Sequence, residues 1–324
     1  NAPVVGLATA QNAANILGAK RVNGAKAFDA THNIAKWLYL VESGKERVTP
    51  GSLIVVDEAS MVTTTHLKEI QEIAAQARAK VVWAGDHAQL SAPGAAGAMR
   101  HLAELGGAYE LTKVHRFAEA WEAEASLKLR DGVAEALTAY DKHGRLTAGS
   151  RETVEAEALR GYLADYLDGK DTLLLASTNE SASALSSRVR AALVEAGVVE
   201  PSGARLRDEN AAGCGDLIVA RSNDTKIKVG EDERPLSNRD VLRVVEVLED
   251  GGIRAALREE GAESDTTVIL PAEYVADKVE LAYAGTTHAA QGRDVETCYS
   301  IVDGTVTDEM LYVMMTRGQK GNYG

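Results

Sequence analysis

Residues 54–60 read Ile-Val-Val-Asp-Glu-Ala-Ser, an apolar run that ends in two adjacent carboxylates. A second apolar run covers 80–84, and segments with helical spacing of apolar residues separate such runs along the first half of the chain. Strands that alternate with helices form a parallel sheet covered on both faces. Asp57 and Glu58 would then lie at the carboxyl edge of that sheet, where α/β folds bind ligands. The stretch therefore predicts an α/β protein with a ligand site at this edge.

This carboxylate pair has two interpretations. Asp57 can hold Mg²⁺ through its water shell, and Glu58 can orient or deprotonate the water that attacks a γ-phosphate. Acidic residues that simply end a strand in solvent are the alternative, and they are common. Gln89 follows the second apolar run, and its amide can donate to a phosphate or accept from water, or merely stabilise a turn. Two strands that end side by side with such groups favour the catalytic interpretation.

Later segments add polar groups that are weak signals one by one. Arg116, in Val-His-Arg-Phe, could be an ordinary surface charge. Residues 286–292 read Thr-Thr-His-Ala-Ala-Gln-Gly after a predicted strand, and His288 alone is more typical of a partly buried structural histidine. An apolar helix is predicted to end at Arg317, where a cation also complements the helix dipole.

Length and composition limit the function classes. A chain of 324 residues suggests about two domains. No apolar run approaches the roughly 18 residues that span a bilayer, and the first residues lack the basic region of a signal peptide. Two cysteines exclude a disulfide framework and a cysteine-rich zinc site. We therefore expect a cytoplasmic protein with no membrane segment.

The net charge of −13 argues against nucleic acid as a partner, because phosphate contacts need lysine and arginine. The acidic residues are unevenly placed, however, and 231–280 alone carry a formal charge of −8. The same region, 215–280, consists of short strand-like pieces between charged turns, which predicts a small antiparallel barrel or meander inserted into a second α/β unit. We expect a narrow neutral-to-positive channel across an otherwise negative surface. No closing strand is predicted over 318–324.

Six motifs follow one another along the chain, from about residue 4 to residue 317. They are Val5-Gly6-Leu7-Ala8-Thr9-Ala10, Asp57-Glu58-Ala59-Ser60, Gly85-Asp86-His87-Ala88-Gln89-Leu90, His115-Arg116-Phe117, Thr287-His288-Ala289-Ala290-Gln291-Gly292 and Tyr312-Val313-Met314-Met315-Thr316-Arg317. Taken in this order, they resemble the motifs of superfamily 1B, or RecD-like, DNA helicases. Two stretches, 33–38 and 90–100, are most similar to the helicase region of large conjugative relaxases of the TraA/MobF type.

This resemblance implies two RecA-like parallel-sheet domains of the P-loop NTPase type with ATP between them. Domain 1A would span 1–168, and domain 2A would comprise 169–214 and 281–324. Residues 215–280 would form an SH3-like 2B insertion, in which the family's Asn-Gly-Asp turn reads Asn238-Arg239-Asp240. The implied protein is an ATP-dependent helicase or translocase that moves on single-stranded DNA from 5′ to 3′.

The resemblance also implies a role for each matching residue. Asp57 and Glu58 would form the Walker B pair, with Mg²⁺ held by Asp57 through water. Gln89 would sense the γ-phosphate of ATP, and Arg116 and Arg317 would act as arginine fingers.

A second implied set connects the nucleotide to DNA. Gln291 and Gly292 would couple the two sites. We expect a monomeric motor that binds single-stranded DNA and works with the conjugation machinery. The residues expected along the DNA are Thr9, Ala10, Thr178, Asn179, Thr287 and His288.

One expected element is missing from the sequence. A P-loop needs Gly-x-x-x-x-Gly-Lys-[Ser/Thr], and the Gly-Lys pairs at 44–45 and 169–170 lack the other residues. In the family this loop lies just before the first strand, so we expect a fragment that starts after it and has weak or no ATPase activity. A RecD-like recombination or repair helicase is one alternative, and a non-hydrolysing DNA-binding scaffold of helicase descent is another. The intact acidic and arginine positions favour a motor.

Overall fold

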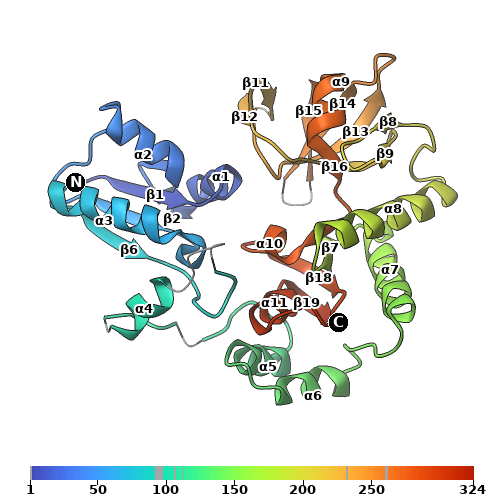
Figure 1. The fold of residues 1–324 in the computed structure, drawn as a ribbon, viewed down its shortest axis with the longest axis horizontal. Coiled ribbons are helices and arrows are strands. Elements are labelled where there is room, and N and C mark those ends of the chain that lie inside the picture. Colours follow the sequence, from blue (N-terminus) through green and yellow to red (C-terminus); the bar gives the residue numbers. More distant parts are fainter. Residues whose placement is uncertain (1, 92–97, 106, 112, 231–232, 260–261) are drawn as a thin grey trace. The chain divides into compact units, whose positions relative to one another are not determined.

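The computed structural model describes residues 2–91, 98–105, 107–111, 113–230, 233–259 and 262–324 (Figure 1). The chain forms two compact units, Asn1–Thr112 and Lys113–Gly324. Within the described residues, no helix is both long and apolar enough to cross a membrane. Residues 92–97, part of the stretch 90–100 that resembles TraA-type proteins, lie outside the described residues.

The first unit contains a parallel sheet with the strand order β4-β1-β5-β6. Leu7 and Ile54 on its central strands are fully buried, together with Trp37 and Ile70 from helices that cover the sheet. The elements are β1 (Val4–Ala8), α1 (Gln11–Ala19), β2 (Arg21–Val22), β3 (Ala25–Lys26), β4 (Ala30–Asn33), α2 (Ile34–Glu42), β5 (Leu53–Val56), the 3₁₀ turn η1 (Ala59–Met61), α3 (Thr64–Ala77), β6 (Lys80–Trp83) and α4 (Ala98–Glu104).

Strand β6 differs from its expected environment. The apolar sequence predicts a buried strand, yet the side chains of β6 alternate between exposed and half-buried, and Val82 is 46% exposed. The reason is its position, because β6 pairs only with β5 among the described strands and forms an edge of the sheet.

The second unit contains another parallel sheet, with the strand order β17-β7-β18-β19. The last strand corrects the expectation for 318–324, since β19 pairs in parallel with β18 and closes this edge. The elements are α5 (Ala120–Arg130), α6 (Glu135–Lys142), α7 (Arg151–Leu167), β7 (Thr172–Ala176), α8 (Asn179–Glu195), β17 (Ala284–Thr286), α10 (Thr287–Ala290), β18 (Val295–Ser300), α11 (Asp308–Met314) and β19 (Gly318–Tyr323).

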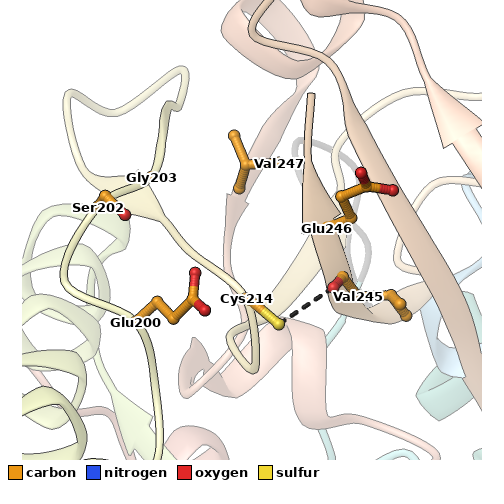
Figure 2. Close-up of a pocket in the computed structure, with 7 residues that line it drawn as sticks. All are labelled: Glu200, Ser202, Gly203, Cys214, Val245, Glu246 and Val247. Carbon is orange, nitrogen blue, oxygen red and sulfur yellow. Dashed lines mark hydrogen bonds between the residues drawn. The ribbon is translucent and has the colours of Figure 1, made fainter. Parts of the chain in front are cut away.

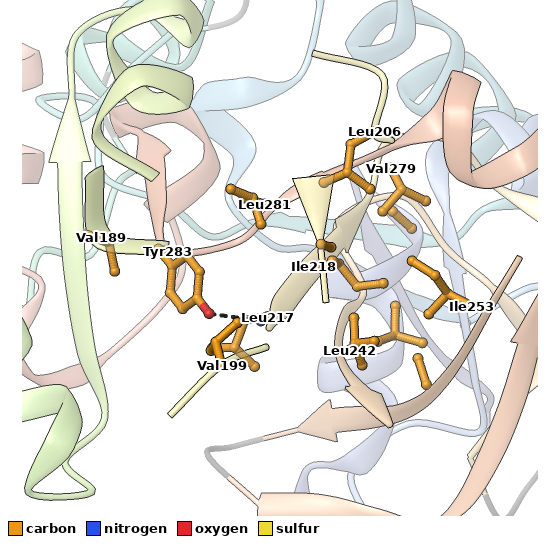
Figure 3. Close-up of a cluster of buried hydrophobic side chains, with 14 of the residues drawn as sticks. Val189, Val199, Leu206, Leu217, Ile218, Leu242, Ile253, Val279, Leu281 and Tyr283 are labelled. Carbon is orange, nitrogen blue, oxygen red and sulfur yellow. Dashed lines mark hydrogen bonds between the residues drawn. The ribbon is translucent and has the colours of Figure 1, made fainter. Parts of the chain in front are cut away.

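A five-stranded antiparallel sheet, with the order β15-β14-β13-β10-β16, is inserted between α8 and β17. Ile218, Leu242, Ile253 and Val279 meet in its core (Figure 3). The elements of this region are β8 (Ala204–Arg205), β9 (Ala211–Ala212), β10 (Leu217–Ala220), β11 (Asp224–Val229), β12 (Arg234–Leu236), β13 (Val241–Val247), β14 (Ile253–Glu259), β15 (Ala262–Leu270), α9 (Ala272–Lys278) and β16 (Val279–Leu281).

The compact units divide at 112/113, earlier in the chain than the domain boundary expected at residue 168. Helices α5–α7 belong to the second unit because they are hydrogen-bonded to its parallel sheet and to the end of α11. The Tyr140 hydroxyl donates to the Met315 carbonyl oxygen at 3.1 Å. The Asp165 carboxylate accepts from the hydroxyls of Thr297 and Tyr299, both at 2.7 Å.

Candidate functional site

The sequence-predicted carboxylates lie at the carboxyl edge of the first sheet. Asp57 and Glu58 directly follow β5, whose last residue, Val56, is level with Leu7 of β1 and Trp83 of β6. The Asp57 amide donates to the Leu7 carbonyl oxygen at 2.8 Å, which fixes the point where the chain leaves the sheet. Both carboxylate residues are half-buried.

The loops after β5 and β6 touch each other. The Ala59 amide donates to the Ala84 carbonyl oxygen at 2.8 Å. A Cβ atom added to Gly85 would lie 2.9 Å from the Ala59 nitrogen, so only glycine allows this approach. Glu58 has a left-handed backbone with φ of 49°, a strained state for a non-glycine residue that concentrates at functional sites. The fold thus brings the Asp-Glu and Gly-Asp-His-Ala-Gln motifs together.

Gln89 supplies the polar atom that fits a ligand at this edge. Its Oε1 is buried and has no hydrogen-bond partner, although buried polar atoms nearly always have one. Carboxylate oxygens are the ligands that Mg²⁺ prefers, and an amide oxygen can accept from a metal-bound or attacking water. The residues present therefore fit a magnesium–phosphate group, and Asp57 is the residue that would hold the ion. Exposed Thr9 and half-buried Ala10 follow β1 at the same edge.

The second sheet brings two of the predicted DNA segments together at its own carboxyl edge. Thr286, the last residue of β17, is level with Ala176, the last residue of β7. Thr178 and Asn179 follow β7 and are exposed, and the Thr178 hydroxyl caps α8 by accepting from the Ser181 amide at 3.1 Å.

Thr287 and His288 follow β17 at this edge and differ in exposure. Thr287 is completely buried, whereas His288 is half-buried. Burial, and then the positive charge of Arg239, lower the pKa of His288, so its imidazole is neutral at physiological pH. His288 is therefore the member of this pair that can present a polar atom to a ligand.

Asp303 is a residue at this edge that the sequence reasoning missed. It follows β18 and accepts from the Ser177 hydroxyl at 3.3 Å and from the Thr305 amide at 2.9 Å. These hydrogen bonds, first those from Thr305, lower the pKa of Asp303. The only sequence signal was its position after a strand.

The arginines lie at the opposite, amino edge of this sheet. Arg317 directly precedes β19, and its carbonyl oxygen accepts from the amide of Val295 at the start of β18. Arg116 pairs with Asp294 at 2.8 Å and donates to the Thr316 carbonyl oxygen at 2.8 Å. The segment that contains Gln291 and Gly292 runs from α10 to β18 and so connects the two edges.

The two arginines differ in exposure. The Arg116 side chain is 29% exposed, whereas Arg317 is 1% exposed. The Arg317 guanidinium donates to the Val313 carbonyl oxygen and the Thr316 hydroxyl, both at 3.1 Å, which is how a cation completes the end of a helix. Thr316 therefore links both arginines, through its carbonyl oxygen and its hydroxyl.

A buried polar pair, Glu122 and Asn322, stabilises the backbone at this edge. The Asn322 side chain accepts from the Gly318 amide at 2.7 Å and donates to the Glu122 carboxylate at 2.9 Å. Glu122 and Asn322 are fully buried, and burial raises the pKa of Glu122. The pair fixes the backbone directly after Arg317, and nothing in the motif pattern indicated it.

A pocket of about 400 Å³ lies elsewhere in the second unit. Figure 2 shows Cys214, whose Sγ donates to the Val245 carbonyl oxygen at 3.0 Å, with Glu200 and Glu246 nearby. Its lining includes none of the predicted site residues.

The two parallel-sheet units define a RecA-like fold of the P-loop NTPase type. Residues 1–151 match the family model described as "AAA domain". The crystal structure of Pif1 helicase from Candida albicans has the same fold, with a TM-score of 0.55 at 14% identity, over 99% of this chain and 84% of that chain. The expected fold class is confirmed.

The sequence relatives are conjugal transfer proteins. "Probable conjugal transfer protein TraA" of Sinorhizobium fredii is 29% identical over 300 residues, which cover 89% of this chain and 26% of the relative. "Conjugal transfer protein TraA" of Rhizobium radiobacter is 30% identical over 294 residues, with the same coverage. The chain spans about a quarter of the length of these relatives. Its sequence is similar to that of TraA conjugal transfer proteins, and its fold is similar to that of the Pif1 helicase, which confirms the resemblance found in its motifs.

Proposed function

We propose that this chain is the motor region of a conjugative relaxase, an ATP-dependent helicase that moves along single-stranded DNA from 5′ to 3′. The contact between the Asp57-Glu58 loop and the Gly85 loop, with the unpartnered Gln89 oxygen beside the same sheet edge, is the observation that carries the proposal. The TraA relatives favour conjugation over a RecD-like repair role. The protein would act as a cytoplasmic monomer with single-stranded DNA and the conjugation machinery as partners.

Within this proposal, each unit contributes its own groups to hydrolysis. Mg²⁺, when bound with ATP, supplies positive charge that neutralises the phosphates, and Asp57 would hold it through water. Glu58 would orient the attacking water and take its proton, while the Gln89 amide contacts the γ-phosphate or that water. Arg116, the more exposed arginine, would reach the transition-state charge directly, and buried Arg317 would support it.

Conversion of this chemistry into movement would use the second sheet. Gln291 and Gly292 lie on the connection between its amino edge, with the arginines, and its carboxyl edge, with Thr178, Asn179 and His288. A change at one edge can therefore reach the other through one short segment. Thr9 and Ala10 would form the corresponding DNA contact of the first unit. The chain alone should hydrolyse ATP weakly, because its sequence holds no Gly-x-x-x-x-Gly-Lys-[Ser/Thr] loop.

Replacement of Glu58 by glutamine in the full-length protein tests the motor. We expect DNA-stimulated ATP hydrolysis to fall about 10²- to 10⁴-fold, the usual contribution of a general base, while nucleotide binding survives. Glu72→Gln is the matched control, because this carboxylate is exposed on α3 and pairs only loosely with Lys68 at 3.7 Å. Unchanged turnover in Glu58→Gln would remove Glu58 from its role. A wild-type protein without DNA-stimulated hydrolysis would instead support the non-hydrolysing scaffold.

A further inference from the structure

Two segments of the second unit that are far apart in sequence bring Arg116 and Asp294 together. Arg116 precedes α5, and two residues after it the Ala118 amide donates to the Gln319 carbonyl oxygen at 2.8 Å. Asp294 precedes β18, and the next amide in the chain donates to the Arg317 carbonyl oxygen at 3.1 Å. Both segments are thus hydrogen-bonded to the backbone at the start of β19. The two side chains therefore meet from backbones that are fixed close by.

The Arg116 guanidinium is held through two of its three nitrogens. Its Nε lies 2.8 Å from Oδ1 of Asp294, and its Nη1 donates to the Thr316 carbonyl oxygen at 2.8 Å. Within the described part of the chain, the third nitrogen, Nη2, donates no hydrogen bond. Because a guanidinium is planar and rigid, two fixed nitrogens also fix the direction of the third. The side chain, which is 29% exposed, is therefore oriented in advance and keeps donors for a ligand.

Of these two contacts, the one to Asp294 comes from the segment that connects the two edges of the sheet. Asp294 stands two residues after Gly292, between α10 and β18. Gly292 has φ of 78°, a left-handed state that favours glycine, and the next amide donates to the Ala290 carbonyl oxygen at 3.1 Å. This turn sets where the Asp294 carboxylate meets Arg116. A change at Gly292 would therefore reach the guanidinium through Asp294.

We infer that Asp294 is the positioning residue of Arg116 and couples it to the segment of Gln291 and Gly292. The inference rests on the proposed function, in which Arg116 contacts the charge that develops on the transferred phosphate. Asp294 would touch no reacting atom itself. Its carboxylate would hold the guanidinium in the direction that the transition state requires, so less side-chain freedom is lost in each turnover. The motif resemblance assigns no role to Asp294.

A double-mutant cycle in the full-length protein tests whether Asp294 acts through Arg116. The kcat of DNA-stimulated ATP hydrolysis and the KM for ATP are measured for wild type, both single alanine variants and the double variant. We expect Asp294→Ala to lower kcat about 10- to 100-fold, because the guanidinium is misplaced, and to change KM less than about twofold. Arg116→Ala should lower kcat about 10³-fold. The double variant should be no slower than Arg116→Ala, because the two residues act as one unit.

Two further variants separate positioning from a general effect of charge or stability. Glu296→Ala is the matched control, because Glu296 lies two residues after Asp294 and pairs with Lys320 instead of Arg116. This variant should keep the kcat of wild type. Asp294→Asn keeps an oxygen that can accept from the Arg116 Nε, so it should retain more activity than Asp294→Ala.

The outcomes distinguish this inference from the function on which it rests. Wild-type kcat in Asp294→Ala, together with a strong loss in Arg116→Ala, overturns the positioning role and leaves the motor intact. Losses that multiply in the double variant also overturn it, because Asp294 would then act on a group other than Arg116. An equal loss in Glu296→Ala overturns it too, since charge alone would explain the effect. A full-length protein without DNA-stimulated hydrolysis overturns the proposed function and this inference with it.

Discussion

Gly85→Ala tests whether the contact between the Asp57-Glu58 loop and the Gly85 loop governs the proposed ATP hydrolysis. The added Cβ would lie 2.9 Å from the Ala59 nitrogen, 3.3 Å from the Ser60 nitrogen and 3.5 Å from the Glu58 carbonyl carbon. The first two distances are shorter than ordinary van der Waals contact, so the Glu58–Ser60 backbone must move by a few tenths of an ångström. Overpacking of this kind costs about 1–3 kcal/mol of stability.

We expect the catalytic loss to exceed the loss of stability. In the proposed mechanism, a displaced Glu58 would no longer hold the attacking water in line, and a misplacement of about 1 Å can cost about 10²-fold in rate. DNA-stimulated ATPase activity of the full-length protein should therefore fall about 10- to 100-fold, with a modest fall in melting temperature. Gly304→Ala is the control, because its added Cβ would meet nothing within 4 Å. If Gly85→Ala melts and hydrolyses ATP like Gly304→Ala, the loop contact does not position Glu58.

Two further substitutions probe the second unit. Because burial raises the pKa of Glu122 above 4.5, its carboxyl stabilises the fold most at low pH, and this stability is lost as pH rises through the raised pKa. Glu122→Gln should remove that loss of stability. The melting temperature of the variant should therefore be higher than that of wild type at pH 8 and equal to it at pH 4. Equal melting temperatures of the two proteins at both pH values would show that the Glu122 carboxylate does not destabilise the fold. Thr178→Ala should lower the free energy of unfolding in urea by about 1 kcal/mol, because the cap of α8 is lost, and Thr178→Ser should restore it. If Thr178→Ala leaves oligothymidine affinity unchanged, capping is the whole role of Thr178.

The first sheet and its ligand edge could be predicted from sequence because both depend on local patterns. The apolar run before Asp57 has the length of a buried strand, and the carboxyl ends of parallel strands share one edge. Predicting Asp57, Glu58 and Gln89 at that edge therefore needed only their positions after strands. The antiparallel sheet of the insertion could be predicted for a similar reason, because short strands separated by charged turns form few other kinds of structure.

Features set by distant partners could not be predicted in this way. The sequence of β6 is apolar like that of a central strand, but its exposure depends on how many strands pair with it. Residues 318–323 have little strand character in the sequence. Strand β19 forms nevertheless, because the Asn322 side chain accepts a hydrogen bond from the Gly318 amide and donates one to the Glu122 carboxylate. The helices before residue 168 join the second unit through bonds such as Tyr140 to Met315, which span 175 residues.

The two arginines show most clearly where local reasoning ends. For Arg317 the sequence allowed two roles, a cation at the end of a helix or an arginine finger. The structure shows the geometry of a helix-terminal cation, because the Arg317 guanidinium donates to the Val313 carbonyl oxygen. At Arg116 the sequence allowed an unremarkable surface charge, yet this side chain joins Asp294 to the Thr316 carbonyl oxygen and keeps 29% of its surface exposed. Since a transition-state contact requires an accessible guanidinium, Arg116 is the stronger candidate for that contact. Thr316 binds both side chains. Movement of Arg116 toward a phosphate would therefore also disturb the contacts of Arg317 and of α11.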